Sequence, residues 1–163
     1  DDLLGPRLMA VPTGVTAGCV LGFDVGARRT GVAVGNGLTL SARALAVIEH
    51  PEDAPDWSRV DALHAEWRPQ ALVVGEPLTL EGDAQLATHR ARRFARQLAE
   101  RYRLPVALVD ERSTSREADR RFAAARARGS ARRRDAALHD AIAAQIILER
   151  WLEAGMPLER PET

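Results

Sequence analysis

The sequence of 163 residues contains no lysine, a single cysteine and few aromatic residues, which make up 4% of the chain. The lone Cys19 excludes an internal disulfide bond and any metal site built from several cysteines. No apolar run approaches the roughly 20 residues of a membrane span, and the opening DDLLGPRLMA does not have the basic-then-apolar pattern of a secretory signal. We therefore expect a cytoplasmic protein with no membrane contact, in which Cys19 is a small buried apolar side chain.

The charges balance in total but are distributed unevenly. All basic residues are arginines, and the 23 basic residues equal the 23 acidic ones. Residues 112–134 hold nine arginines and two acids, whereas residues 49–66 hold six acids and one arginine. A neutral chain with this distribution can present a cationic face to a polyanion. The alternative is that these charges only solvate exposed helix faces.

The hydrophobic pattern predicts one α/β domain with no internal repeat and no linker. Three short strands joined by tight turns come first, and strand–helix units follow. This order predicts a mixed five-stranded sheet, with three antiparallel strands and then two parallel strands, flanked by helices. Strands are expected at 19–26, 29–36, 40–50, 70–77 and 104–111, and helices at 56–67, 83–103, 115–127 and 139–155.

Three positions carry carboxylates in apolar surroundings. Asp24 ends the first strand, Asp110 and Glu111 end the last strand, and Asp140 lies in the apolar closing helix. Ligands of α/β sheets gather at the carboxyl ends of parallel strands. An acid on the buried side of a helix costs several kcal/mol unless it is paired or binds a metal. These acids are therefore candidate metal ligands.

Oxygen ligands of this kind suit Mg²⁺ or Mn²⁺ better than zinc. Two such ions about 4 Å apart can activate a water molecule and stabilise the leaving oxygen of a phosphodiester. Nearby arginines would then bind the flanking phosphates. Each acid alone also fits a plainer role: Asp110 can cap, and Ser113 or Thr114 can be the N-cap of the next helix. The residues by themselves leave both explanations open.

Four blocks of the sequence resemble the YqgF (RuvX) family of RNase H-like proteins, which are described as pre-16S rRNA nucleases and Holliday-junction-resolvase-like proteins. FDVGARRTGVAVG is similar to the family's Asp-x-Gly-x-x-Arg-x-Gly-Val-Ala opening, and VVGEP is similar to its Val-Val-Gly-x-Pro block. DERSTSREA and DAIAAQIILERWL resemble the Asp-Glu-Arg block and the closing Asp-x-x-Ala-Ala helix. The blocks occur in order across about residues 20–152. The resemblance implies an RNase H-like nuclease domain over residues 19–155, with a flexible arm at 1–18 and a tail at 156–163.

The resemblance also implies site residues. Asp24, Glu111 and Asp140 would be the catalytic metal ligands, binding Mg²⁺ or Mn²⁺. Successive strand residues point to opposite faces, so we expect Glu111 to face the metals and Asp110 to support or cap. The arginines expected to bind nucleic acid are Arg28, Arg29, Arg112, Arg132, Arg133 and Arg134.

Three features depart from the family pattern. Glu76 stands where relatives often have an apolar residue, and it is either an extra acid beside Asp24 or a loop acid. His139 stands where an aliphatic residue is usual, and it either contacts phosphate or simply packs. The segment ARARGSARRRD is rich in arginine and is interpreted as a mobile substrate clamp.

The resemblance implies a divalent-metal nuclease that acts on RNA or DNA: in 5′-end processing of pre-16S rRNA, or on single-stranded DNA or Holliday junctions. Its partners would be nucleic acid and pre-ribosomal particles, and the protein would be a monomer or a homodimer. One alternative is a sugar-kinase or actin-like ATPase, which needs two copies of such a domain to enclose a nucleotide. The other is a non-catalytic nucleic-acid-binding module for ribosome assembly. Metal-dependent cleavage would distinguish the nuclease from the latter.

Overall fold

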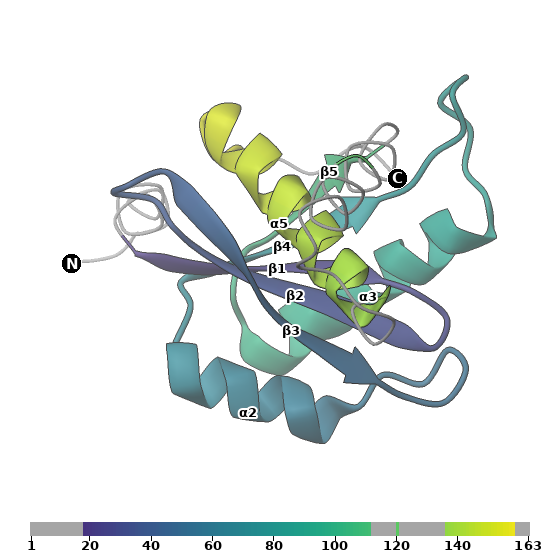
Figure 1. Ribbon diagram of the computed structural model, residues 1–163, viewed down its shortest axis with the longest axis horizontal. Coiled ribbons are helices and arrows are strands. Elements are labelled where there is room, and N and C mark those ends of the chain that lie inside the picture. Colours follow the sequence, from purple (N-terminus) through teal and green to yellow (C-terminus); the bar gives the residue numbers. More distant parts are fainter. Residues whose placement is uncertain (1–17, 112–119, 121–135, 159–163) are drawn as a thin grey trace.

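A computed structural model describes residues 18–111, 120 and 136–158 of the chain. One five-stranded sheet forms its centre, with strands in the order β3-β2-β1-β4-β5 (Figure 1). The strands are β1 (Cys19–Val25), β2 (Arg29–Asn36), β3 (Ser41–Glu49), β4 (Ala71–Glu76) and β5 (Val106–Asp110). The first three pair antiparallel, and β4 and β5 continue the sheet in parallel. The predicted mixed sheet is confirmed.

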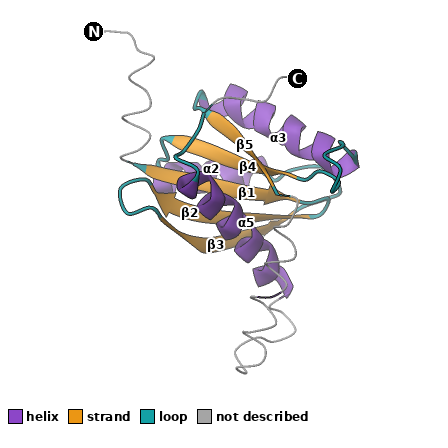
Figure 2. Cartoon of the chain, turned by 90° about the horizontal axis from the view of Figure 1, so that it is seen from above, coloured by secondary structure: helices purple, strands orange, loops and turns teal. Residues whose placement is uncertain are grey.

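Helices cover both faces of the sheet (Figure 2). On one face, α2 (Trp57–Trp67) and α3 (Leu86–Tyr102) pack on a core that includes Phe23, Leu72 and Val74. On the other face, α5 (Ala136–Glu153) packs on a core that includes Val20 and Val73. All six residues of β4 are buried, as its unbroken apolar pattern predicts for a strand covered on both sides.

Element boundaries differ from the sequence prediction in a few places. The second long helix begins at Leu86 and not at residue 83, because Gln85 and Thr88 form a capping box there. The closing helix starts at Ala136, three residues earlier than predicted. The helix expected at 115–127 and the arginine-rich segment after it lie outside the described residues, apart from the helical Arg120. Cys19 is only partly buried.

No helix in the described ranges has both the length and the apolar character to cross a membrane.

The closest approach between a helix and the sheet occurs at Gly31 of β2. A Cβ atom at this position would lie 2.0 Å from the carbonyl oxygen of Asp140 and 3.0 Å from the backbone nitrogen of Ala141. The absence of a side chain at Gly31 therefore lets the first turns of α5 rest directly on β2. Gly31 is also the register partner of Asp24 on β1, so the same contact brings Asp140 near Asp24.

Replacing Gly31 with alanine should lower the free energy of unfolding by about 3 kcal/mol, because backbone atoms of α5 occupy the space of the new methyl group. Gly22→Ala is the graded control, since its Cβ would meet the Leu148 side chain at 3.2 Å, which can shift. Urea unfolding followed by circular dichroism measures both variants. Equal stability of the two variants would contradict the proposed contact.

Candidate active site

Asp24 lies near the carboxyl end of β1 and faces α5. Its neighbours Phe23 and Val25 belong to the core under α2 and α3, so the alternation of the strand turns Asp24 to the other side. The side chain keeps part of its surface open at the end of the strand. The structure thus places this acid where protein, rather than water, makes up most of its surroundings.

Asp140 reaches the same region from α5. Its Oδ2 atom lies 2.8 Å from Nε of Arg29, which sits at the start of β2 and is 45% exposed. Oδ2 is a buried atom, and its contact with Arg29 is an ion pair whose geometry falls outside that of a hydrogen bond. The Arg29 charge compensates this carboxylate, and Oδ2 can accept a contact from another cation if the arginine moves away.

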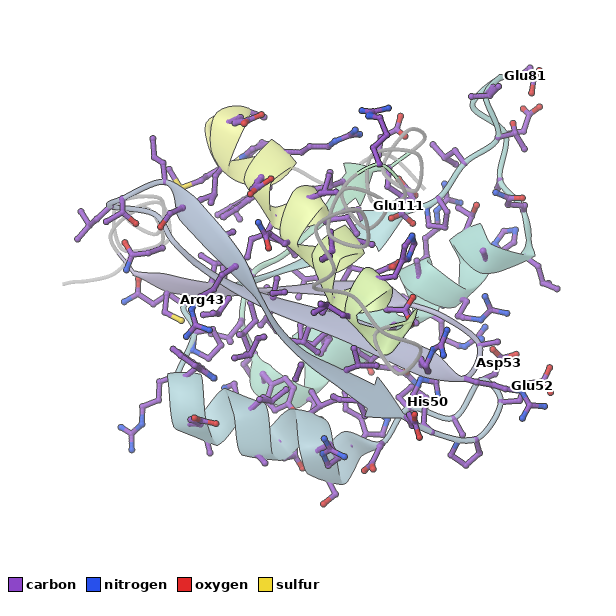
Figure 3. The ribbon with its side chains drawn as sticks, in the orientation of Figure 1. Arg43, His50, Glu52, Asp53, Glu81 and Glu111 are labelled. Atoms are coloured by element: carbon purple, nitrogen blue, oxygen red, sulfur yellow. The ribbon has the colours of Figure 1, made fainter. Side chains whose placement is uncertain are left out.

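Glu111 follows β5 and approaches the site across β4. Its backbone nitrogen donates to the Glu76 carbonyl oxygen at 3.3 Å, which extends the β4–β5 ladder by one residue. A Cβ atom on Gly75 would lie 2.7 Å from Oε1 of Glu111 and 2.4 Å from Ile147 of α5. Glu111 therefore lies on the α5 face, over Gly75 (Figure 3). Asp110 is exposed and is the register partner of Glu76.

The electrostatics of the site oppose ionisation of two of the acids. Burial, with a smaller contribution from the charge of Asp140, raises the pKa of Asp24 to about 7, while His139 opposes this shift. Burial and the charge of Asp24 raise the pKa of Glu111 to about 9, and Arg150 opposes it. The shared influence of Asp24 shows that these carboxyl groups are close enough to repel each other. Excess negative charge in partly desolvated surroundings favours a bound cation.

The position of Glu76 differs from the one predicted from the sequence. It was expected either as an extra acid beside Asp24 or as a loop acid, but it is the buried last residue of β4. Its Oε2 atom lies 2.5 Å from Nε of Arg92 on α3. Glu76 has the same strand parity as Leu72 and Val74 and therefore lies on the α3 face. It does not join the acids on the α5 face.

The remaining candidates are placed as follows. Arg28 is exposed in the turn between β1 and β2 and pairs with Glu52 at 3.5 Å. His139 is partly exposed and lies near enough to Asp24 to lower its pKa. Arg112 and Arg132–134 lie outside the described residues.

Sequence reasoning missed one cation and two close contacts. The positive charge of Arg150 on α5 lowers the pKa of Glu111. The glycines Gly31 and Gly75 leave space for Asp140 and Glu111. The glycines stand in the quoted family blocks, so the sequence did hold a signal. No sequence pattern indicated Arg150, because its distance from Glu111 depends on how α5 crosses the sheet.

The residues fit a hard divalent cation by their chemistry. Asp24, Glu111 and Asp140 supply only carboxylate oxygens, which are the preferred ligands of Mg²⁺ and Mn²⁺. In the part of the chain that the structure describes, no three acidic, histidine or cysteine side chains converge closely enough to enclose an ion as they stand. The Arg29 guanidinium group supplies the positive charge next to Asp140.

Comparisons with known proteins identify the fold and the family. The structure of the fowlpox virus resolvase in complex with substrate Holliday junction DNA matches with a TM-score of 0.52 and 10% identity, covering 85% of this chain and 99% of that one. The fold is therefore RNase H-like. A family model for RuvX, described as Holliday junction resolvase, matches residues 18–154. The chain belongs to the RuvX (YqgF) family, a family of nucleases.

Curated relatives extend over nearly the same region. A protein of Xanthomonas oryzae named "Putative pre-16S rRNA nuclease" is 61% identical over 137 residues, which cover 84% of this chain and 88% of that protein. A protein of Xanthomonas campestris with the same name is 60% identical over 135 residues, covering 83% of this chain and 87% of the relative. The four sequence blocks therefore identified the family correctly.

Asp24→Asn should stabilise the metal-free protein above neutral pH. The pKa of Asp24 is higher in the folded state than in the unfolded state, so the wild type loses stability as the pH rises from about 4 through 7. In EDTA at pH 8 the variant should exceed the wild type by about 4 kcal/mol in free energy of unfolding. At pH 4 the two should be equal.

Urea unfolding at both pH values measures this difference. Asp83→Asn, an exposed acid in the loop after β4, is the matched control and should show no pH-dependent gain. A pH-independent effect of Asp24→Asn would show that burial does not raise the pKa of Asp24.

Proposed function

We propose that this protein is a divalent-metal-dependent nuclease that hydrolyses phosphodiester bonds through Asp24, Glu111 and Asp140. The observation that carries this proposal is that acids from β1, the end of β5 and α5 lie on the same face of the sheet, where Asp140 is paired with Arg29 at 2.8 Å. Such an arrangement is costly for folding and is useful for holding a cation. Family membership supports the same reaction class.

In this mechanism the three carboxylates would hold Mg²⁺ or Mn²⁺. A bound divalent ion supplies Lewis-acid polarisation of the phosphate and lowers the pKa of a water molecule. Asp24 and Glu111 would remain ionised at neutral pH when the ion compensates their charge. Arg29, which is half-exposed beside Asp140, would donate hydrogen bonds to the non-bridging oxygens of the phosphate.

For the substrate, we propose a precursor of 16S rRNA, cleaved near its 5′ end within pre-ribosomal particles in the cytoplasm. The support is the name of relatives about 60% identical to this chain. The family description as a Holliday junction resolvase makes branched DNA the second substrate to test. Arg28, exposed in the turn after β1, and Arg29, exposed at the start of β2, would bind the phosphates of either strand.

The wild type should cleave an RNA that spans the 5′ end of 16S rRNA when Mn²⁺ or Mg²⁺ is present, and it should be inactive in EDTA. Asp24→Asn should reduce the rate at least about a thousandfold, because one carboxylate charge of the ion site is lost with little change of shape. Gel analysis of end-labelled RNA, single-stranded DNA and a four-way junction measures cleavage and substrate choice.

Asp83→Asn is the control for this assay and should retain wild-type activity. Cleavage that persists in EDTA, or that Asp24→Asn does not reduce, would contradict the metal mechanism. Binding without cleavage in any metal would instead identify a non-catalytic assembly factor.

A further inference from the structure

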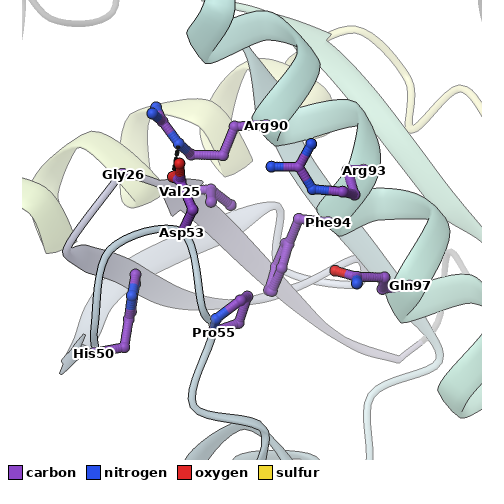
Figure 4. A pocket seen from close by; sticks show the side chains of 9 residues that line it. All are labelled: Val25, Gly26, His50, Asp53, Pro55, Arg90, Arg93, Phe94 and Gln97. Carbon is purple, nitrogen blue, oxygen red and sulfur yellow. Dashed lines mark hydrogen bonds and ion pairs between the residues drawn. The ribbon is translucent and has the colours of Figure 1, made fainter.

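A second feature lies on the other face of the same strand end. It is a pocket of about 40 Å³ between the end of β1, the loop after β3, and α3 (Figure 4). Asp24 and Val25 are consecutive, and their side chains point to opposite faces. The pocket thus begins one residue beyond the candidate catalytic acid. The residues that line it include Val25, Gly26, Asp53, Arg90, Arg93 and Gln97.

The pocket has an excess of positive charge. The single carboxylate, Asp53, is neutralised by Arg90, whose Nε lies 2.6 Å from Oδ1. Arg93 has no acidic partner among the described residues, and Figure 4 shows its guanidinium group turned from α3 toward the pocket. One arginine therefore remains to attract an anion, and the amide of Gln97 stands beside it as a further donor.

The side of the pocket opposite α3 is formed by the loop after β3, which is fixed by hydrogen bonds. Backbone nitrogens of His50 and Asp53 donate to the carbonyl oxygens of Arg28 at 3.0 Å and Ala27 at 2.7 Å. His50 Nδ1 donates to the Pro51 carbonyl oxygen at 2.9 Å, and His50 Nε2 is hydrogen-bonded to the Thr30 hydroxyl group at 2.9 Å. The loop is thereby tied to the β1–β2 turn, which is followed by Arg29 at the acid site. The pocket and the acid site share this turn as a common support.

Size limits what the pocket can hold. About 10–15 Å³ is needed for one water molecule, so 40 Å³ accommodates a few oxygen-sized groups. This is enough for the oxygens of one phosphate and too little for a nucleobase. Arginine is suited to this ligand, because its planar fork of donors matches phosphate oxygens.

We propose that this pocket is a phosphate subsite, in which Arg93 binds a backbone phosphate of the nucleic-acid strand outside the linkage that is cleaved. The inference rests on the proposed nuclease function and adds a second anchor on the α3 face. A strand held on both sides of the β1 end passes over Gly26 and presents one phosphodiester to the acids. Arg93 is a positioning residue and does not touch the reacting atoms.

Arg93→Gln tests the subsite, and Arg96→Gln is its matched control, since both are exposed arginines of the same helix and only Arg93 lines the pocket. Binding of a 2′-O-methyl oligonucleotide is measured in EDTA, so that the result does not depend on cleavage. Arg93→Gln should weaken binding about tenfold and reduce the salt dependence by about one phosphate contact. Arg96→Gln should change affinity less than about twofold.

A scan with single methylphosphonate linkages distinguishes a subsite from general attraction. One linkage should weaken binding to the wild type and to Arg96→Gln, yet make no further difference to Arg93→Gln. Equal losses in both arginine variants, or no position-dependent loss in the wild type, would overturn the proposal. A further result would also overturn it: inorganic phosphate raises the melting temperature of the wild type but not of Arg93→Gln, while both proteins bind the oligonucleotide equally well. If Arg93 contributes to binding but no cleavage is found in any metal, the nuclease function is contradicted and the phosphate subsite is not.

Discussion

Helix α5 rests its backbone directly on β2 at Gly31, and the geometry of the acid site depends on this contact. A side chain at Gly31 would collide with the Asp140 carbonyl oxygen, so the helix would have to move away from the sheet. Asp140 would then leave the neighbourhood of Asp24, because Gly31 and Asp24 are register partners. A second close contact, at Gly75, makes the same kind of room for Glu111. Two positions without side chains thus allow acids from separate elements to meet.

The meeting of these acids creates an electrostatic problem that the metal-free protein solves only in part. Burial and mutual repulsion raise the pKa values of Asp24 and Glu111. Arg29 supplies one positive charge beside Asp140 without an aligned hydrogen bond. Ionising these carboxyl groups is unfavourable in the metal-free protein, and a bound cation would remove this unfavourable term. The same turn that carries Arg29 also supports the pocket on the opposite face.

Much of this arrangement could be predicted from the sequence. The apolar pattern predicts the mixed sheet, and the alternation of strand residues predicts that Glu111 and Asp110 lie on opposite faces. The face of Glu76 was not predicted, because β4 is apolar throughout and its pattern does not indicate which side meets which helix. The pairing of Arg29 with Asp140 depends on how closely α5 approaches β2. The Arg93 pocket depends on how the loop after β3 folds back, and local sequence specifies neither.

The most direct test of the acid site is anomalous scattering from a crystal of the wild-type protein grown with Mn²⁺. A manganese peak bounded by Asp24, Glu111 and Asp140 is expected, with the Arg29 guanidinium moved away from Oδ2 of Asp140. A crystal with no peak at this position and the Arg29–Asp140 pair intact at saturating Mn²⁺ would contradict this expectation. In that case the buried acids would be structural, and the nuclease chemistry would have to lie elsewhere.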